Sequence, residues 1–353
     1  MSTPDADRSY LRRTALTVGI AGLVIGGLYL AISLVRVLLI LFAGLLLAVF
    51  LSGLTDVIRR RVPSLPRILV LAGVTLVLFS GLGGIFILAG PDISGQIAQL
   101  VDRLPAALQR LRTLVENTPW AQELVRNLPT IERLLPAPME VVGGVTDVFS
   151  TTMGALTNTM IILLVGIYGA VNPDVYVSGL AHLFPKGRRA RLREVLHALG
   201  RVLRWWLVGR LTSMAIVGVL TTTGLWGAGV PSAVALGLIA ALLDFVPYIG
   251  PIVAVVPALL VASIVGVEEV FYVLIIYAAV QALEAYLITP LVQERAVSIP
   301  PALLIAAQVI MGVLAGATGV LMATPLAVSV IVLVQMLYVE DALGDSVKIL
   351  GQH

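Results

Sequence analysis

Long uncharged apolar runs alternate with shorter polar segments along almost the whole chain. Several runs are long enough to cross a bilayer as a helix, which takes about 20 residues. The plainest span residues 14–34, 37–55, 68–90, 148–171 and 270–283, and the last continues past Glu284. The pattern predicts an all-α fold, that of a polytopic helical membrane protein.

Two further apolar runs are too long to be single straight spans. Residues 231–267 contain one charge, Asp244, and residues 300–339 contain none. At about 1.5 Å per residue they would form helices of roughly 55 and 60 Å, nearly twice the hydrocarbon thickness of about 30 Å. We therefore expect each run to be interrupted near its middle.

Helix-breaking residues lie where these interruptions are expected. Non-helical backbone at membrane depth is tolerated only where it is buried in protein or lines a cavity, so both breaks should point inward, as at a transporter's substrate site. Each run could instead be two short spans joined by a tight turn, or a re-entrant hairpin. We predict breaks at 244–251, with Pro247, Gly250 and Pro251, and at 312–325, with Gly312, Gly316, Gly319 and Pro325.

The basic residues indicate which segments face the cytoplasm, because cytoplasmic loops carry an excess of Lys and Arg. Arginines gather before residue 14, at 59–67 and in 172–204, so we place these segments inside. Residues 91–147, with five basic and seven acidic residues, are placed outside. The predicted division is a cytoplasmic tail at 1–13, three spans within 14–90, an external amphipathic region at 91–147, a fourth span at 148–171, a basic cytoplasmic interfacial helix at 172–204, a C-terminal membrane bundle at 205–339 and a cytoplasmic tail at 340–353.

Two of the polar segments carry an apolar stripe at helical spacing. In 172–204 the leucines and valines form one face and the arginines the other, which predicts an interfacial helix anchored to anionic lipid. The stripe in 91–147 could pack on the protein, lie in the membrane interface or contact a neighbouring subunit. Its members are Ile93, Ile97, Leu100, Val101, Leu104, Leu108, Leu111 and Val115.

Composition excludes most soluble functions. Only 12% of the residues are charged, against about 25% in a soluble domain, and the mean hydropathy is +1.02. There is no cysteine, which excludes disulfides and Cys-ligated metals. His182, His197 and His353 lack metal-ligand spacing and no catalytic motif is present, so we expect no enzyme activity and no metal or cofactor. Basic and aromatic residues form no polar platform, so no nucleic-acid partner is expected.

Three charged residues stand out in the apolar C-terminal bundle: Arg210, Asp244 and Glu284. A charge in the bilayer core costs at least about 2.5 kcal/mol, so it faces the bundle interior or a cavity and usually has a partner. Arg210 lies near the end of its span and could snorkel to the surface, whereas Asp244 could line a pathway or cap freed backbone amides. Gln281 shares a helical face with Glu284, and the two could bind a polar solute or a cation. If Asp244 and Glu284 approach each other, we expect a site that can carry a proton.

Two stretches resemble the signature of a known family. They are GVPSAVALGLIAALLDFVPYIGPIVAVVPALL and QALEAYLITPLVQERAVSIPPALLIAAQVIMGVLAGATGVLMATPLAV. Both resemble the AI-2E family of membrane proteins, the autoinducer-2 exporter group, which implies a transporter of about seven or eight passes that forms a homo-oligomer, with a pentamer as a first guess. Arg210 departs from the pattern, where an uncharged polar residue is expected. The matching positions, which the resemblance assigns to the substrate or ion pathway, are Asp244, Pro247, Tyr248, Gly250, Pro251, Gln281, Glu284, Pro290, Gly316, Gly319 and Pro325.

Three functions are consistent with these observations. The first is export of a small polar solute, for which autoinducer-2 is the family's named example. The second is sodium/proton antiport, for which Asp244 and Glu284 are the relevant residues. The third is a membrane scaffold that transports nothing, in which the breaks are structural. The expected partners are the lipid bilayer, a solute or cation and further copies of the chain, in a bacterial inner membrane with a cytoplasmic N-terminus.

Overall fold

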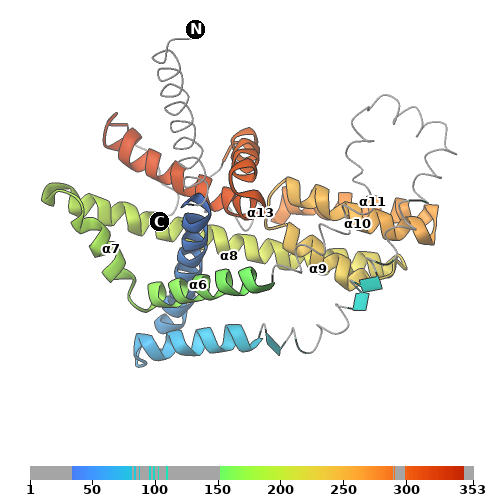
Figure 1. The fold of residues 1–353 in the computed structure, drawn as a ribbon, viewed down its shortest axis with the longest axis horizontal. Helices are drawn as coiled ribbons and strands as arrows, with labels where there is room; N and C mark the ends of the chain where they lie inside the picture. Colours follow the sequence, from blue (N-terminus) through green and yellow to red (C-terminus); the bar gives the residue numbers. More distant parts are fainter. Residues whose placement is uncertain are drawn as a thin grey trace, which may run out of the picture.

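The computed structural model describes residues 34–81, 152–288 and 299–345, with residues 83, 84, 87, 95, 96, 98, 99, 102, 109 and 290 as isolated positions. Within these residues every regular element is a helix, which confirms the all-α prediction (Figure 1). The predicted first span at 14–34 and the greater part of the external region at 91–147 lie outside the described residues. The helices are Leu34–Arg61, Arg67–Gly81, α6 (Thr152–Val171), α7 (Pro173–His182), the 3-10 turn η1 (Lys186–Arg188), α8 (Arg189–Gly227), α9 (Ala233–Leu243), α10 (Ile249–Val265), α11 (Val267–Leu283), the π-helical turn η2 (Glu284–Ile288), α13 (Pro301–Val334) and the π-helical turn η3 (Gln335–Glu340).

Four of the described helices are long and apolar enough to cross a membrane. They span Leu34–Arg61, Lys186–Gly227, Val267–Ile288 and Pro301–Glu340. The pair α6 and α7 is bent by 89° and raises the count to five if it forms one span. These helices confirm a polytopic helical membrane protein, whereas the count of seven or eight passes stays a prediction.

Among the described helices α8 is the longest without a break, and its 39 residues run from the basic segment into the following apolar run. Its buried residues recur every three or four positions, which gives the helix an apolar stripe. In the first half of α8 this stripe packs against Leu46 of the 34–61 helix and against the end of α13. Its second half packs against α9 and α11. The helix α8 is therefore the axis on which the other elements assemble.

The first long run folds into a helical hairpin made of α9 and α10. Ala233 at the start of α9 and Ala262 near the end of α10 lie in one buried cluster, whereas Ala240 and Ala254 lie in another. The two helices are therefore antiparallel, as Figure 1 also shows. At about 1.5 Å per residue, the 11 residues of α9 extend only about 16 Å, too short for a bilayer crossing.

The tip of this hairpin lies between Leu243, where α9 ends, and Ile249, where α10 begins. Tyr248 has a φ of 66°, in the left-handed region, and so helps to reverse the chain. A Cβ atom at Gly250 would overlap the carbonyl oxygen of Leu243, so only glycine allows the two helices this approach. The prediction of a break at 244–251 is confirmed.

The second long run is broken in the same way, within α13. Ala315 and Gly316 have non-helical backbone angles, and Gly316 has a φ of 62°. A Cβ atom at Gly319 would overlap the carbonyl oxygen of Met311, although residues eight positions apart lie about 12 Å apart along a straight helix. The chain therefore turns back sharply at Gly316, which confirms a break within 312–325.

Candidate functional site

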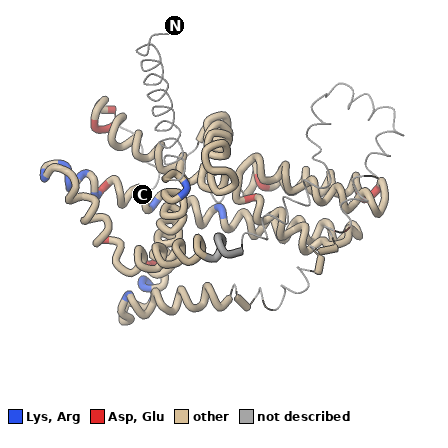
Figure 2. The backbone as a smooth tube through the Cα atoms, in the orientation of Figure 1, with Lys and Arg blue, Asp and Glu red and all other residues tan. Residues whose placement is uncertain are grey.

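The charged residues Arg210, Asp244 and Glu284 meet at one point in the fold. Arg210 Nη1 donates a hydrogen bond to Glu284 Oε1 at 3.0 Å, and Arg210 Nη2 lies 3.1 Å from Asp244 Oδ1. Their side chains are only 2%, 7% and 1% exposed, respectively. Figure 2 shows how few charged residues the surrounding helices carry. We call these three residues, with Ser213 and Gln281, the Arg210 site.

Each charged residue comes from a different element. Arg210 projects from the middle of α8, and Asp244 is the first residue after α9, at the hairpin tip. Glu284 opens the π-helical turn η2 directly after α11. Single π-helical turns within α-helices occur frequently at functional sites. The hairpin tip is fixed to α8 by a second contact, because the rings of Trp206 and Phe245 pack edge to face with centroids 5.8 Å apart.

Two neutral side chains complete the site. Gln281 Nε2 donates to Glu284 Oε2 at 2.9 Å, so this carboxylate is held from both sides. The hydroxyl of the buried Ser213 lies 3.4 Å from both Asp244 Oδ2 and Glu284 Oε1. A hydroxyl has one proton to donate, so Ser213 can hydrogen-bond one of these carboxylates at a time. Its bond can therefore change from one carboxylate to the other.

The Arg210 site carries more negative than positive charge. When both carboxylates are ionised, Asp244 and Glu284 together outweigh the single guanidinium by one charge. An uncompensated buried charge is costly, and Asp244 also lies at the C-terminal end of α9, where the helix dipole disfavours an anion. Within the described residues, Arg210 Nε has no hydrogen-bond partner, and Asp244 Oδ1 has only its ion pair with Arg210 Nη2. The excess negative charge can therefore be balanced by a proton or a cation, and the free N–H group of Arg210 can donate to a hydroxyl group of a polar solute.

Two interpretations of these residues are corrected by the structure. Arg210 does not snorkel, because its guanidinium is buried and is directed at two carboxylates. Asp244 does not cap freed amides, since its carboxylate contacts Arg210 and Ser213 and no backbone N–H group of the described chain. Asp244 and Glu284 do approach each other, since both contact Arg210 and Ser213, which is the condition set for a proton-carrying site.

The remaining predicted positions are distributed around this centre. Pro247 lies at the hairpin tip, and its carbonyl accepts a hydrogen bond from Gln308 Nε2 at 2.9 Å. Gly250 and Pro251 form the first turn of α10. Gly316, Gly319 and Pro325 lie in α13, while Tyr248 and Pro290 are exposed. Their part in a pathway stays a prediction.

Gln308 is a site residue that the sequence interpretation missed. It is fully buried and connects the first half of α13 to the tip of the α9–α10 hairpin through Pro247. Its Oε1 atom has no hydrogen-bond partner among the described residues. The available signal was an amide side chain within the uncharged run 300–339. Ser213 gave no such signal, because a serine is common in apolar helices.

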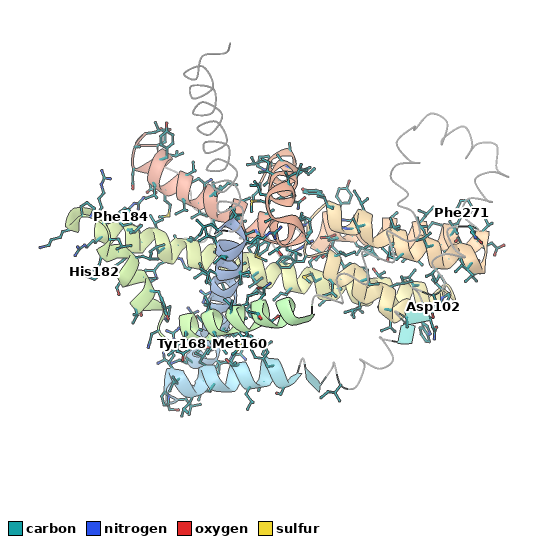
Figure 3. All side chains as sticks on the ribbon, viewed as in Figure 1. Asp102, Met160, Tyr168, His182, Phe184 and Phe271 are labelled. Atoms are coloured by element: carbon teal, nitrogen blue, oxygen red, sulfur yellow. The ribbon has the colours of Figure 1, made fainter. Side chains whose placement is uncertain are left out.

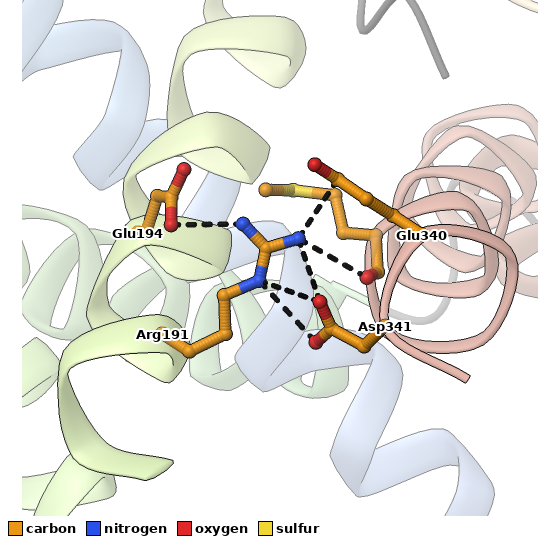
Figure 4. A network of polar contacts seen from close by, with 5 residues as sticks. Arg191, Glu194, Glu340 and Asp341 are labelled. Atoms are coloured by element: carbon orange, nitrogen blue, oxygen red, sulfur yellow. Dashed lines mark hydrogen bonds and ion pairs between the residues drawn. The ribbon is translucent and has the colours of Figure 1, made fainter. Parts of the chain in front are cut away.

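A second polar network lies near the start of α8 (Figure 4). Arg191 contacts Glu194 on its own helix at 2.8 Å, and Glu340 and Asp341 at the end of η3 at 2.8 and 3.0 Å. The same guanidinium donates to the carbonyl oxygen of Met336 at 3.3 Å. We call these residues the Arg191 network; it ties the start of α8 to η3.

Comparisons with known proteins agree on one family. The sequence model of a family described as AI-2E family transporter matches residues 18–338. The chain is 25% identical over 303 residues to "Putative transport protein YrrI" of Bacillus subtilis, a match that covers 81% of this chain and 83% of that protein. It is 31% identical over 267 residues to "Putative transport protein MT0215" of Mycobacterium tuberculosis, which covers 71% of each chain.

Proposed function

The chain belongs to the AI-2E transporter family, and on that basis we propose that it moves a small polar solute across the membrane through the Arg210 site. Autoinducer-2 is the family's named example of such a solute. The observation that carries the proposal is the burial of three charged side chains from three elements at the tip of a helical hairpin. Ionisable groups inside a membrane bundle are functional by default, because they are expensive to keep there.

The arrangement around the site supports this proposal. Broken helices near the bilayer midplane place backbone and side-chain polar groups where a solute can bind. Here the tip of the α9–α10 hairpin carries Asp244, and the fold of α13 carries Gln308, which contacts the same tip. A solute with several hydroxyl groups would find donors in Arg210 and Gln281 and acceptors in the two carboxylates.

A second candidate, sodium/proton antiport, is favoured by the charge balance of the site. Two carboxylates face one guanidinium, so a sodium ion or a proton at the site would neutralise the remaining charge. Alternate occupation by the two cations is what an antiporter requires. From the distribution of arginines we further propose a cytoplasmic N-terminus. From the family we propose a bacterial inner membrane location and a homo-oligomeric assembly.

Reconstituted liposomes distinguish these functions. One set is loaded with autoinducer-2 and its efflux is measured; a second contains a pH-sensitive dye and receives external sodium. Solute export predicts efflux that Glu284→Gln and Asp244→Asn reduce at least about tenfold, as expected when a buried charged partner worth about 1.5–3 kcal/mol is lost. Antiport predicts sodium-driven alkalinisation that the same variants abolish.

The matched control is Glu268→Gln, which removes an exposed carboxylate from the first turn of α11 and should leave either flux unchanged. Flux that survives in both site variants would contradict a role for the Arg210 site. Absence of flux of sodium, protons and autoinducer-2 in the unaltered protein would leave the scaffold function as the better explanation.

A further inference from the structure

A cavity of about 950 Å³ lies away from the Arg210 site, between the 34–61 helix, α6, α7 and α8. Its volume is at the upper end of the range of about 300–1,000 Å³ for ligand sites. Most of its wall is apolar side chain, and Tyr168 of α6, labelled in Figure 3, is one lining residue. We call it the lateral cavity.

The lateral cavity is apolar at one end and charged at the other. On the 34–61 helix its lining begins with Leu41 and Leu45 and ends with Asp56. Fifteen positions separate Leu41 from Asp56, which is about 22 Å along a helix. Half of a bilayer, with its headgroup region, is about 20–22 Å thick. The cavity therefore has the length and the polarity gradient of one membrane leaflet.

The charged end of the lateral cavity has an excess of positive charge. Arg67, Arg201 and Arg204 line it together with Asp56 and Asp174. Arg204 is paired with Asp56 at 3.6 Å, and Arg67 donates to the carbonyl oxygen of Ala170 at 3.4 Å. Arg201 has neither a hydrogen bond nor an ion pair with any residue that the structure describes. Figure 2 shows that Lys and Arg gather around the start of α8 and the end of the 34–61 helix.

From this geometry we propose that the lateral cavity binds one anionic phospholipid. The phosphate lies against Arg201 and Arg204, and an acyl chain follows the apolar wall past Leu45. Arg201 supplies the preference for a net negative headgroup, because it is an exposed cation with no described partner, whereas Arg67 is directed at the Ala170 carbonyl and Arg204 is paired with Asp56. The occupant is a lipid rather than a free anion, because most of the cavity wall has no polar group to offer.

The test uses the full chain in detergent and counts bound lipids by native mass spectrometry. The probes are phosphatidylglycerol and phosphatidylcholine with identical oleoyl chains. We expect one retained phosphatidylglycerol per chain, bound about fivefold more tightly than phosphatidylcholine, since one basic residue near a lipid surface contributes about 1 kcal/mol. Arg201→Gln should remove this preference. Arg193→Gln, the matched exposed arginine on the same helix outside the cavity, should preserve it.

Leu45→Trp tests the apolar end of the cavity independently. Leu45 lines the cavity and is exposed, so the larger indole ring can fill the cavity without disturbing the core. It should lower retention of both lipids. The proposal is overturned if Arg193→Gln weakens the binding of phosphatidylglycerol as much as Arg201→Gln does, because that would indicate a general effect of surface charge. It is also overturned if Leu45→Trp changes nothing, as when another segment or a second copy fills the cavity, or if inorganic phosphate competes as well as the lipid.

Discussion

Two arginines on α8 form ion pairs in different surroundings: Arg191 contacts three acidic residues and Arg210 contacts two. Arg191 is 25% exposed and its acidic partners are 38–52% exposed. Arg210 is 2% exposed and its partners are 1% and 7% exposed. The Arg191 network has three carboxylates and lies where water can reach it, whereas the Arg210 site has two and lies inside the bundle.

The number of ion pairs does not determine how much they contribute to the free energy of unfolding. An exposed pair contributes about 0–1 kcal/mol, because water already solvates both charges and salt screens them. A buried pair has lost that solvation, so removing one member leaves an uncompensated charge and costs about 3–5 kcal/mol. Loss of the Arg191 network should therefore lower the free energy of unfolding only slightly. Loss of any one charged residue of the Arg210 site should lower it strongly.

The largest effect is expected for Arg210→Gln. It leaves Asp244 and Glu284 buried without their cation, so the free energy of unfolding should fall by about 3–5 kcal/mol. Chemical unfolding of the purified protein in detergent, followed by circular dichroism, measures this. Arg193→Gln, an exposed arginine of the same helix, is the control and should stay within about 0.5 kcal/mol of the unaltered chain. Equal stability of both variants would contradict a large contribution of the buried ion pairs to the free energy of unfolding.

A second experiment removes the whole Arg210 site at once. Arg210→Met, Asp244→Leu and Glu284→Leu together replace the charges by apolar groups, and such replacements are neutral or stabilising by about 1–4 kcal/mol. We expect a folded protein with no measurable flux in the liposome assays. A stable triple variant that still transports would show that the site is structural.

Gly250→Ala tests the hairpin tip that carries Asp244 to Arg210. The new Cβ would overlap the backbone carbonyl of Leu243, which cannot move away as a flexible side chain would. We expect a loss of about 1–3 kcal/mol in the free energy of unfolding, typical of overpacking, together with reduced flux. Gly179→Ala in α7, where nothing lies within 4 Å of the new atom, should instead be neutral or slightly stabilising. Similar losses in both variants would contradict the close approach at Gly250.

The smallest effect is expected for Arg191→Gln. Its pairs are exposed, so the free energy of unfolding should fall by about 1 kcal/mol or less. That small difference should shrink further at about 1 M salt, where the Debye length is only about 3 Å, whereas the loss in Arg210→Gln should persist. Unfolding curves at low and high salt measure both responses, and a salt-independent loss at Arg191 would contradict its exposure.

The two breaks could be predicted from the sequence, because length alone forbids a single span and glycine and proline mark the breaks, whereas their hairpin form could not. The three charged residues of the site could also be named, since charges in apolar runs are conspicuous. Their pairing could not be predicted: Arg210 lies 34 positions from Asp244 and 74 from Glu284, and only the packing of α8 against the hairpin brings them together. The snorkelling interpretation was wrong for this reason, because hydropathy indicates depth along a span and not which neighbour a side chain faces.

The unbroken length of α8 gives it a mechanical property that neither arginine has alone. Nineteen positions separate Arg191 from Arg210, which is about 28 Å along the helix axis. Between them runs a continuous helix, whose backbone hydrogen bonds make it stiff. A tilt of α8 therefore acts as a lever: a rotation of a few degrees at the exposed end displaces the buried end by a length comparable to a hydrogen bond. A displacement of α8 at the surface where it meets η3 would thus be transmitted along the helix to the charged residues at the centre of the bundle.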